Sequence, residues 1–409
     1  MNIKSQTNKE FCCFCGCSAK DLIIKEEAAL YYSLDQKNAI CSNCIDIFSF
    51  DLESDGEIDN INSFFDLKPK EIVEKLNEHI IGQDSAKKTL ALAAYQHYKR
   101  INSDESTEIE LDKSNILLIG PTGSGKTLMV KTLAKILNVP CYIGKATALT
   151  ESGYMGDDVE SLIEGLLEKA KMNVAAAERG IIFIDEVDKL ARSPDSGQVK
   201  DPSGLGTQHA LLTLLEDDEV VAYKKYQFKE GIKVSTKNIL FIASGAFSGI
   251  SEVVNKRINK TNTNIGFDAV FSKVKEDQEL NMSEVSSEDF VSYGLVPEFV
   301  GRFPIVSAIK GLSLEETIRV IKEPKNSILK QYKEMFSTEN TELLIDDNTL
   351  EEMSKTVLKN KTGARGLRGC FNYFLEDALY DAANTEGNKI CTLTKEDIIK
   401  LNKAKINLI

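Results

Sequence analysis

The most regular feature of this 409-residue chain is a series of short apolar runs separated by stretches of helical periodicity. Five of these runs are rich in Ile, Leu, Val and Phe and predict buried β-strands. They cover residues 115–119, 141–143, 181–184, 238–243 and 304–309. Between them, apolar residues recur at helical spacing, as at Val130, Leu133, Ala134 and Leu137. Strands that alternate with helices predict an α/β fold with a parallel five-stranded sheet covered on both faces.

Composition divides the chain into four segments. Residues 1–50 are rich in cysteine, and residues 51–63 contain five acidic residues and no basic ones, which is typical of a solvated linker. The α/β pattern occupies residues 64–310, which we expect to form a large domain. Over residues 311–409 helical patterns dominate and the strand signal weakens. This last segment predicts a smaller, mostly helical C-terminal domain.

The overall composition is that of a globular protein, with 42% hydrophobic and 28% charged residues. The net charge of −13 disfavours broad binding to nucleic acid or anionic membranes, although a local basic channel stays possible. No apolar run is long enough to span a membrane, and the sequence starts without the apolar core of a signal peptide. We therefore expect a cytoplasmic protein.

The segment GPTGSGKT, residues 120–127, fits the phosphate-binding P-loop pattern. An apolar strand precedes it and an amphipathic helix follows it, as the pattern requires. Its glycines allow main-chain N–H groups to surround phosphates at a helix N-terminus. We expect Lys126 to neutralise the β- and γ-phosphates and the Thr127 hydroxyl to bind Mg²⁺. The sequence thus predicts a site for ATP.

A second segment, GIIFIDEVDKL at residues 180–190, places two acidic residues at the end of a buried strand. We expect Asp185 to approach the Mg²⁺ and Glu186 to polarise a water for attack on the γ-phosphate. A pair of surface acids is common at a strand end, but its place after a P-loop favours the catalytic interpretation. A carboxylate beside the Mg²⁺ aspartate indicates a hydrolase rather than a kinase.

The N-terminal cysteines form two CxxC pairs, and each pair can hold a metal through a tight turn. The pairs Cys12/Cys15 and Cys41/Cys44 would complete a tetrahedral four-sulfur site suited to Zn²⁺. A redox dithiol is the rival interpretation, but a single pair would suffice for it. With four protein ligands and no open position, the predicted zinc site is structural.

The two motifs GPTGSGKT and FIDEVDK resemble those of AAA+ ATPases, and further segments resemble the ClpX family of protein unfoldases within the Clp/HSP100 group. Residues 79–100 are similar to the segment ahead of the P-loop in that family, and residues 322–326, KEPKN, are also similar to it. Residues 294–305 resemble its arginine-finger segment, and residues 361–369 its sensor-2 helix. The resemblance covers nearly the whole chain.

The resemblance assigns roles to single residues. It implies that Arg302 reaches the γ-phosphate of a neighbouring subunit and that Arg365 contacts the nucleotide of its own chain. It also implies a homohexameric ring, in which hydrolysis depends on assembly. The predicted nucleotide-binding residues are Ile80, Ile81, Gly82, Gly120, Pro121, Thr122, Gly123, Ser124, Gly125, Lys126, Thr127 and Leu128.

Two segments resemble the substrate-gripping pore loops of the family. In ESGYMGDD, residues 151–158, Tyr154 and Met155 would grip a polypeptide by apolar contact. Residues 199–212 resemble the second pore loop, but Leu205 stands where the family pattern has an acid, and a basic RKH stretch is not evident. These departures leave the preferred degradation tags open. Ser244 is the nearest candidate for the polar sensor-1 residue.

The segment NKTNTNIGFDAVF, residues 259–271, begins as a polar stretch that predicts a loop. Ile265, Gly266 and Phe267 then form an apolar tripeptide that no helical or strand period explains. Local physics alone favours a small apolar cluster that fixes the loop. The family resemblance implies instead a loop that docks on a partner protease.

Together these features predict an ATP-driven unfoldase that delivers tagged or unfolded proteins, directly or through adaptors, to a ClpP-type peptidase. The cysteine-rich module resembles the family domain that dimerises and receives adaptors and some substrates. A nucleic-acid-dependent AAA+ protein is the alternative, and it predicts a basic zinc module or pore, which the charge balance does not favour. A non-catalytic scaffold would lack Lys126 or Glu186. We expect ATP, Mg²⁺ and Zn²⁺ as cofactors and neither membrane nor nucleic acid as a partner.

Overall fold

The computed structural model describes residues 30–32, 39–42, 67–102, 112–150, 157–191, 202–216, 219–222, 231–262, 285–360 and 363–408. The chain forms two compact units, Met1–Phe64 and Phe65–Ile409. In the first unit, β1 (Leu30–Tyr32) pairs with β2 (Ala39–Cys41) in an antiparallel ladder. The predicted linker 51–63 lies outside the described residues, and the proposed domain boundaries stay predictions.

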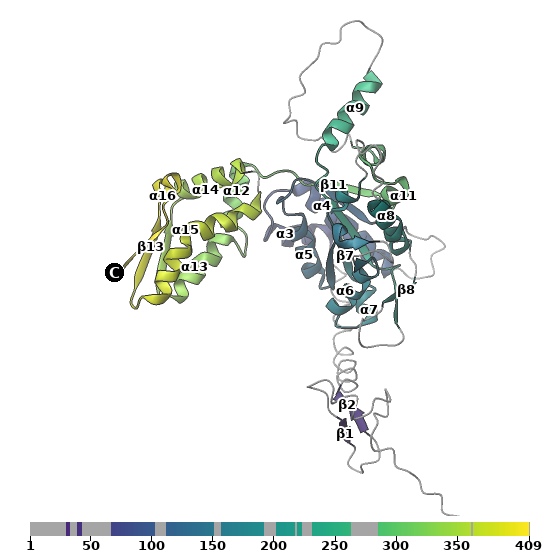
Figure 1. Cartoon of the computed structure of the whole chain (residues 1–409), viewed down its shortest axis with the longest axis horizontal. Coiled ribbons are helices and arrows are strands. Elements are labelled where there is room, and N and C mark those ends of the chain that lie inside the picture. The colour runs from purple at the N-terminus through teal and green to yellow at the C-terminus, as the bar shows by residue number, and fades with distance from the viewer. Residues whose placement is uncertain are drawn as a thin grey trace, which may run out of the picture. The chain divides into compact units, whose positions relative to one another are not determined.

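The second unit contains the predicted five-stranded parallel sheet (Figure 1). The strand order is β11-β3-β10-β7-β4, and every neighbouring pair is parallel. All five strands coincide with the predicted apolar runs, apart from small differences at their ends. They are β3 (Ile116–Ile119), β4 (Cys141–Lys145), β7 (Ile181–Asp185), β10 (Leu240–Gly245) and β11 (Ile305–Ala308).

Side chains that alternate along each strand form two hydrophobic cores, one on each face of the sheet. In β3, Ile116 and Leu118 enter one core, whereas Leu117 and Ile119 enter the other. The first core is closed by α3 (Pro69–Asn77), α4 (Asp84–Ile101) and α5 (Lys126–Leu137). The second is closed by α6 (Ser161–Lys169), α7 (Val174–Ala177), α8 (Pro202–Leu215), α10 (Ser287–Tyr293) and α11 (Pro297–Gly301). Burial on both faces explains why these strands read as continuous apolar runs.

Shorter elements connect the layers. Two 3₁₀ turns, η2 (Ala146–Ala148) and η3 (Val187–Leu190), follow β4 and β7. Two small ladders join β5 (Leu149–Thr150) to β6 (Asp157–Asp158) and β8 (Glu219–Ala222) to β9 (Ile232–Ser235). Helix α9 spans Ile250–Asn262, so residues 259–262, which we predicted to be a loop, are helical. The helix continues through these polar residues because none of them is a proline or glycine.

Beyond residue 311 a third core forms, and helices dominate it as predicted. The helices are α12 (Leu314–Lys322), α13 (Ile328–Thr338), α14 (Asp347–Lys359), α15 (Ala364–Asn384) and α16 (Lys395–Lys400). A three-stranded sheet that the sequence did not predict accompanies them. It orders β12 (Thr341–Ile345), β13 (Lys389–Leu393) and β14 (Lys405–Leu408), with β12 parallel and β14 antiparallel to β13.

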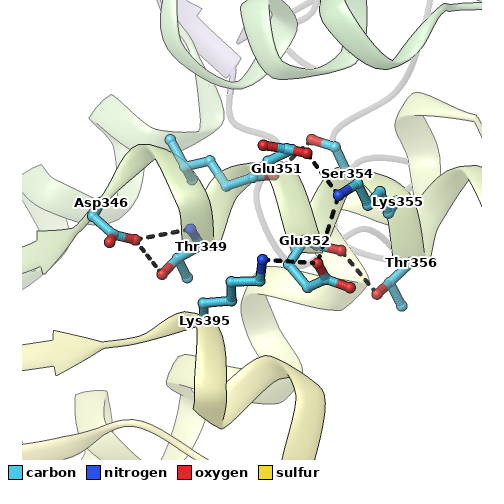
Figure 2. Close-up of polar contacts among 9 residues, drawn as sticks. Asp346, Thr349, Glu351, Glu352, Ser354, Lys355, Thr356 and Lys395 are labelled. Carbon is cyan, nitrogen blue, oxygen red and sulfur yellow. Dashed lines mark hydrogen bonds and ion pairs between the residues drawn. The ribbon is translucent and has the colours of Figure 1, made fainter.

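The polar face of α14 illustrates how these helices are capped and which ion pairs lie on their surface (Figure 2). The Asp346 carboxylate accepts a hydrogen bond of 2.8 Å from the main-chain N–H of Thr349 and caps the helix. One turn further along, Lys355 Nζ lies 2.6 Å from Glu351 Oε1 and 3.8 Å from Glu352 Oε2. Such half-exposed pairs add little stability, so the buried face of α14 supplies most of the stabilisation.

Across the described ranges, no helix is both long enough and apolar enough to cross a membrane.

Candidate functional site

The P-loop is the turn between β3 and α5, and its glycines are required by its geometry. A Cβ atom on Gly120 would lie 2.1 Å from the carbonyl oxygen of Ile309, so only glycine fits at the end of β3. The Gly120 N–H donates to the Gly245 carbonyl at 3.2 Å, which joins the ends of β3 and β10. Gly123 and Gly125 have φ angles of 79° and 98°, which L-residues rarely adopt. Glycine at these positions thus allows the tight turn that the predicted phosphate cradle requires.

Lys126 begins α5 with its side chain buried under the loop. Its Nζ donates to the carbonyl oxygens of Gly120 and Pro121 at 2.6 and 3.0 Å. Burial lowers the pKa of Lys126, the carboxylates of Asp185 and Asp188 oppose that shift, and the Arg365 guanidinium adds to it. The ammonium group therefore feels the charges of the Asp185 and Asp188 carboxylates and of the Arg365 guanidinium.

Asp185, at the carboxyl end of β7, lies between two hydroxyl groups. Thr127 Oγ1 donates to its Oδ2 at 3.3 Å, so the residues predicted to hold Mg²⁺ are close together. Ser244, on the neighbouring strand β10, donates to Oδ1 at 2.5 Å. The candidate for the sensor-1 residue is therefore hydrogen-bonded directly to the aspartate predicted to approach Mg²⁺. A hydroxyl facing a carboxylate is a donor set that suits Mg²⁺.

Glu186 follows in the left-handed conformation, with φ of 64°. This unusual backbone forms a tight turn, in which the Glu186 N–H donates to Asp185 Oδ1 at 2.9 Å. The Glu186 carboxylate accepts a hydrogen bond of 3.1 Å from Thr147 Oγ1 and lies 3.5 Å from Lys145 Nζ. Non-glycine residues in this conformation are common at functional sites because the surroundings must enforce it.

A third acid, Asp188, belongs to the site and was missed from the sequence. Its side chain is almost fully buried, and Oδ1 accepts the main-chain N–H of Ala246 at 3.1 Å. Its buried Oδ2 has no hydrogen-bond partner among the described residues, although Lys189 Nζ lies 3.5 Å away. The signal in the sequence was a further carboxylate three positions after Asp185.

These groups surround a cavity of about 430 Å³. Of the predicted nucleotide-binding residues, Thr122, Gly123, Gly125, Lys126, Thr127 and Leu128 line it. Both predicted acids and Arg365 line it too, together with four residues that the sequence did not single out besides Asp188. These are Lys189, Ala246, Ser248 and Ala364. One cavity therefore brings together the predicted phosphate cradle, the residues predicted to hold Mg²⁺ and the Glu186 carboxylate.

The N-terminus of α15 reaches this cavity through a close backbone contact. The Ala364 N–H donates to the Gly123 carbonyl at 3.1 Å. Gly363 precedes it with φ of 58°, and a Cβ there would lie 2.9 Å from the same oxygen. This contact places Arg365 beside the P-loop.

The IIGQ segment, predicted to lie against the base, joins α3 to α4 through two residues with positive φ, Gly82 and Gln83. Ile80 and Ile81 are buried, and neither they nor Gly82 line the cavity. The Gln83 amide exchanges two hydrogen bonds of 2.9 Å with the main chain of Lys310. This pairing joins the segment to the end of β11, and its contact with a base stays a prediction.

Arg302 does not line the cavity of its own chain. It caps the C-terminus of α11, and its Nη2 donates to Glu216 Oε1 at 2.6 Å. Both side chains are about half exposed. The structure therefore separates Arg302 from the other four predicted catalytic residues.

Several predicted residues lie outside the described part of the chain. They are Cys12, Cys15 and Cys44 of the zinc site, Tyr154 and Met155 of the pore loop, and Ile265, Gly266 and Phe267. Cys41 is described, and it is buried in β2. Within the described ranges no group of three or more His, Cys, Asp or Glu side chains is arranged to hold a metal ion.

Residues 111–306 match the family model described as an AAA domain (Cdc48 subfamily). The matched segment contains all five strands of the parallel sheet except the last two residues of β11, together with the P-loop, Asp185 and Glu186. The chain thus contains an AAA+ ATPase domain, which hydrolyses ATP with Mg²⁺.

Proposed function

We propose that this AAA+ ATPase is a protein unfoldase of the ClpX type. It would hydrolyse ATP to unfold protein substrates and to translocate them through a homohexameric ring into a ClpP-type peptidase. The observation that carries the proposal is the separation of Arg302 from its own cavity. Every other predicted catalytic group lines that cavity, so the arginine is available to a neighbouring chain.

The residues at the cavity divide the chemistry among them. The P-loop main chain and Lys126 bind the phosphates, while Thr127 and Asp185 hold the Mg²⁺ ion, which neutralises phosphate charge when bound. Glu186 accepts a proton from the attacking water. Its carboxylate is bonded to Thr147 and lies near Lys145, so it exchanges these partners for the water before hydrolysis.

Arg302 makes hydrolysis depend on assembly. An arginine supplied by a neighbour stabilises transition-state charge and contributes about 10³- to 10⁵-fold in rate in other phosphoryl-transfer enzymes. AAA+ proteins commonly assemble as hexamers, and in such a ring each site would be completed by the next subunit. The ATPase activity per chain should then fall when the protein is diluted below its assembly concentration.

The remaining parts of the proposal rest on the sequence. Tyr154 and Met155 would grip the substrate in the pore, and the altered position Leu205 would influence which tags are preferred. Cys12, Cys15, Cys41 and Cys44 would hold a structural Zn²⁺ ion in a module that receives adaptors.

The test is to mix the full chain with a ClpP-type peptidase, ATP and a fluorescent tagged substrate. We expect ATP-dependent loss of fluorescence and, with Phe267→Ala, loss of degradation while ATP hydrolysis and unfolding persist. Tyr380→Ala removes a well-exposed aromatic side chain from α15 and is the matched control. Loss of ATPase activity or of folding in Phe267→Ala would favour the packed-cluster interpretation.

The same assay distinguishes the alternative from another class. Stimulation of ATP hydrolysis by DNA or RNA, without stimulation by unfolded tagged protein, would contradict the unfoldase and support a nucleic-acid-dependent motor.

A further inference from the structure

Helix α8 contacts both the catalytic turn and the helix that bears Arg302. Its residue Gln208 is completely buried, and its amide group uses both polar atoms. Nε2 donates to the Leu190 carbonyl at 2.8 Å, and Oε1 accepts the main-chain N–H of Val296 at 2.8 Å. One side chain therefore joins two segments that are more than a hundred residues apart in sequence.

The two bonded segments both belong to the predicted machinery of hydrolysis. Leu190 ends η3, the turn that begins directly after Glu186. Val296 is the residue before the first turn of α11, and Arg302 follows the last turn of that helix. The N–H of Val296 stands at the start of α11, where the helix offers it no carbonyl, and the amide of Gln208 accepts its hydrogen bond.

The approach of α8 to the catalytic turn is close. A Cβ on Gly204, one turn before Gln208, would lie 2.9 Å from the Leu190 carbonyl oxygen. At the other end of α8, Glu216 accepts the hydrogen bond from Arg302. Between these points Leu211, Leu214 and Leu215 share a hydrophobic core with Phe299 of α11. Helix α8 thus contacts both ends of α11 through hydrogen bonds. The two helices are neighbours in Figure 1.

We infer that Gln208 is a positioning residue that fixes the arginine helix α11 relative to the Glu186 turn of the same chain. A change at one ATP site would then be passed to the arginine that this chain offers to the next subunit. This inference rests on the proposed ring, in which Arg302 acts on a neighbour.

A mixture of two inactive subunits can test this role. Glu186→Gln chains would supply Arg302 but not hydrolyse, and Arg302→Ala chains would hydrolyse only at a site completed by a Glu186→Gln neighbour. We expect the mixture to regain ATPase activity. We then expect Gln208→Met, placed only in the Glu186→Gln chains, to lower kcat at least tenfold with little change in KM. The hydrolysing chains in that mixture keep Gln208, so the loss reports on the arginine.

The outcomes separate the inference from the proposed function. If the mixture with Gln208 intact in all chains regains no activity, the arginine does not act between chains. The inference and the proposed function are then both overturned. The other outcome is that the mixture regains activity and that Gln208→Met in the arginine-supplying chains does not change this activity. In that case the inference alone is overturned. Tyr98→Phe in the same chains is the matched control, because it removes one hydrogen bond, of 3.0 Å to the Arg179 carbonyl, at the opposite end of β7 from Glu186.

A second variant covers the case in which Gln208→Met fails to fold. In Gln208→Glu the side chain keeps its length, and it can make both hydrogen bonds only when its carboxyl group is protonated. The activity of this mixture, relative to the unmodified one, should therefore rise as the pH is lowered. A ratio that does not change with pH would overturn the inference, because a purely structural loss would not follow that protonation.

Discussion

At the scale of single residues, two hydroxyl groups orient Asp185, the proposed Mg²⁺ ligand. Thr127 and Ser244 each donate to a different oxygen of Asp185, at 3.3 and 2.5 Å. Thr127 belongs to the P-loop helix, whereas Ser244 belongs to the adjacent strand β10. The Ser244 hydroxyl therefore keeps one oxygen in place while the other stays available to the ion.

Replacing Ser244 with alanine should raise the Mg²⁺ concentration that hydrolysis requires. Partners of metal-binding carboxylates are worth about 10- to 100-fold in metal affinity, so we expect at least a tenfold higher Mg²⁺ requirement. The measurement is ATPase activity against Mg²⁺ concentration. Ser337→Ala, at an exposed position in α13, is the control and should match the unmodified protein. An unchanged Mg²⁺ requirement in Ser244→Ala would show that the hydroxyl does not orient Asp185.

His97 illustrates a residue whose burial sets a pH dependence. It is almost completely buried in α4, and its Nε2 donates to the Asn238 carbonyl at 3.0 Å. Burial, with the nearby Arg100 charge, lowers the pKa of His97 to about 3. In the unfolded chain His97 binds a proton near pH 6.5, whereas in the folded chain it stays neutral there. The free energy of unfolding therefore falls as the pH drops below about 6.5.

The expected size of this effect follows from linkage. Lowering the pH from about 7.5 to about 5.5 should cost about 1.4 kcal/mol of unfolding free energy through His97 alone. Urea unfolding at the two pH values, for the unmodified chain and for His97→Gln, measures the difference. The glutamine variant should lose that part of the pH dependence, and an equal dependence in both proteins would contradict the assignment.

At the scale of elements, an ion pair with a buried carboxylate joins α9 to α10. The Arg257 guanidinium donates twice to the Asp289 carboxylate, at 2.8 and 2.9 Å. Asp289 also accepts the main-chain N–H of Ser286 and so caps α10. Burial alone would raise the pKa of Asp289, but the hydrogen bonds from Arg257 and Ser286 outweigh it and hold the pKa below its usual value.

The variant Asp289→Asn should destabilise this part of the fold. Removing one partner of a fully buried pair costs about 3–5 kcal/mol, and we expect about 2–3 kcal/mol here because Arg257 keeps some contact with water. Chemical unfolding measures the loss. Glu323→Gln, which breaks the exposed pair with Arg319, should change stability much less, because water screens an exposed ion pair. Similar losses in the two variants would mean that burial of the pair is not decisive.

The elements that the sequence predicted are those with the strongest burial. Strands such as β7, whose first four residues are apolar and buried, were found because burial on both faces gives a continuous signal. In β12 buried and exposed positions alternate over only five residues, a pattern too short to separate from its helical surroundings. Asp188 was missed because no sequence motif assigns a role to this third acid. Its place in the site depends on the folded contact with Ala246, which follows β10.

The pairing of Arg302 with Glu216 and the bridge made by Gln208 could not be predicted either. Arg302 and Glu216 lie more than eighty residues apart, as do Gln208 and Val296, and no local pattern in the sequence brings such partners together. By contrast, the P-loop and the Asp185–Glu186 pair were predicted because their chemistry depends on adjacent residues.

At the scale of the whole molecule, the nucleotide cavity depends on the contact between α15 and the P-loop. A methyl group on Gly363 would press on the Gly123 main chain and would occupy a backbone region costly for other residues. We expect Gly363→Ala to bind ATP about fivefold more weakly or worse, equivalent to about 1 kcal/mol of strain. Titration with a fluorescent ATP analogue measures this.

Gly369→Ala is the matched control, because Gly369 lies in the same helix and a Cβ there meets nothing within 4 Å. It should bind the analogue as the unmodified chain does. Equal affinity in all three proteins would mean that the contact does not shape the cavity.

The contact between Ala364 and the Gly123 carbonyl has a second consequence, which concerns the effect of ATP on α15. If docking of α15 improves the cradle for ATP, then bound ATP strengthens the docking of α15 by the same factor, because coupling between two equilibria is reciprocal. A force that pulls α15 away from the P-loop therefore lowers the affinity for ATP to the extent that ATP resists the pull. The force needed to undock α15 and the affinity for ATP therefore both report on the same docking equilibrium.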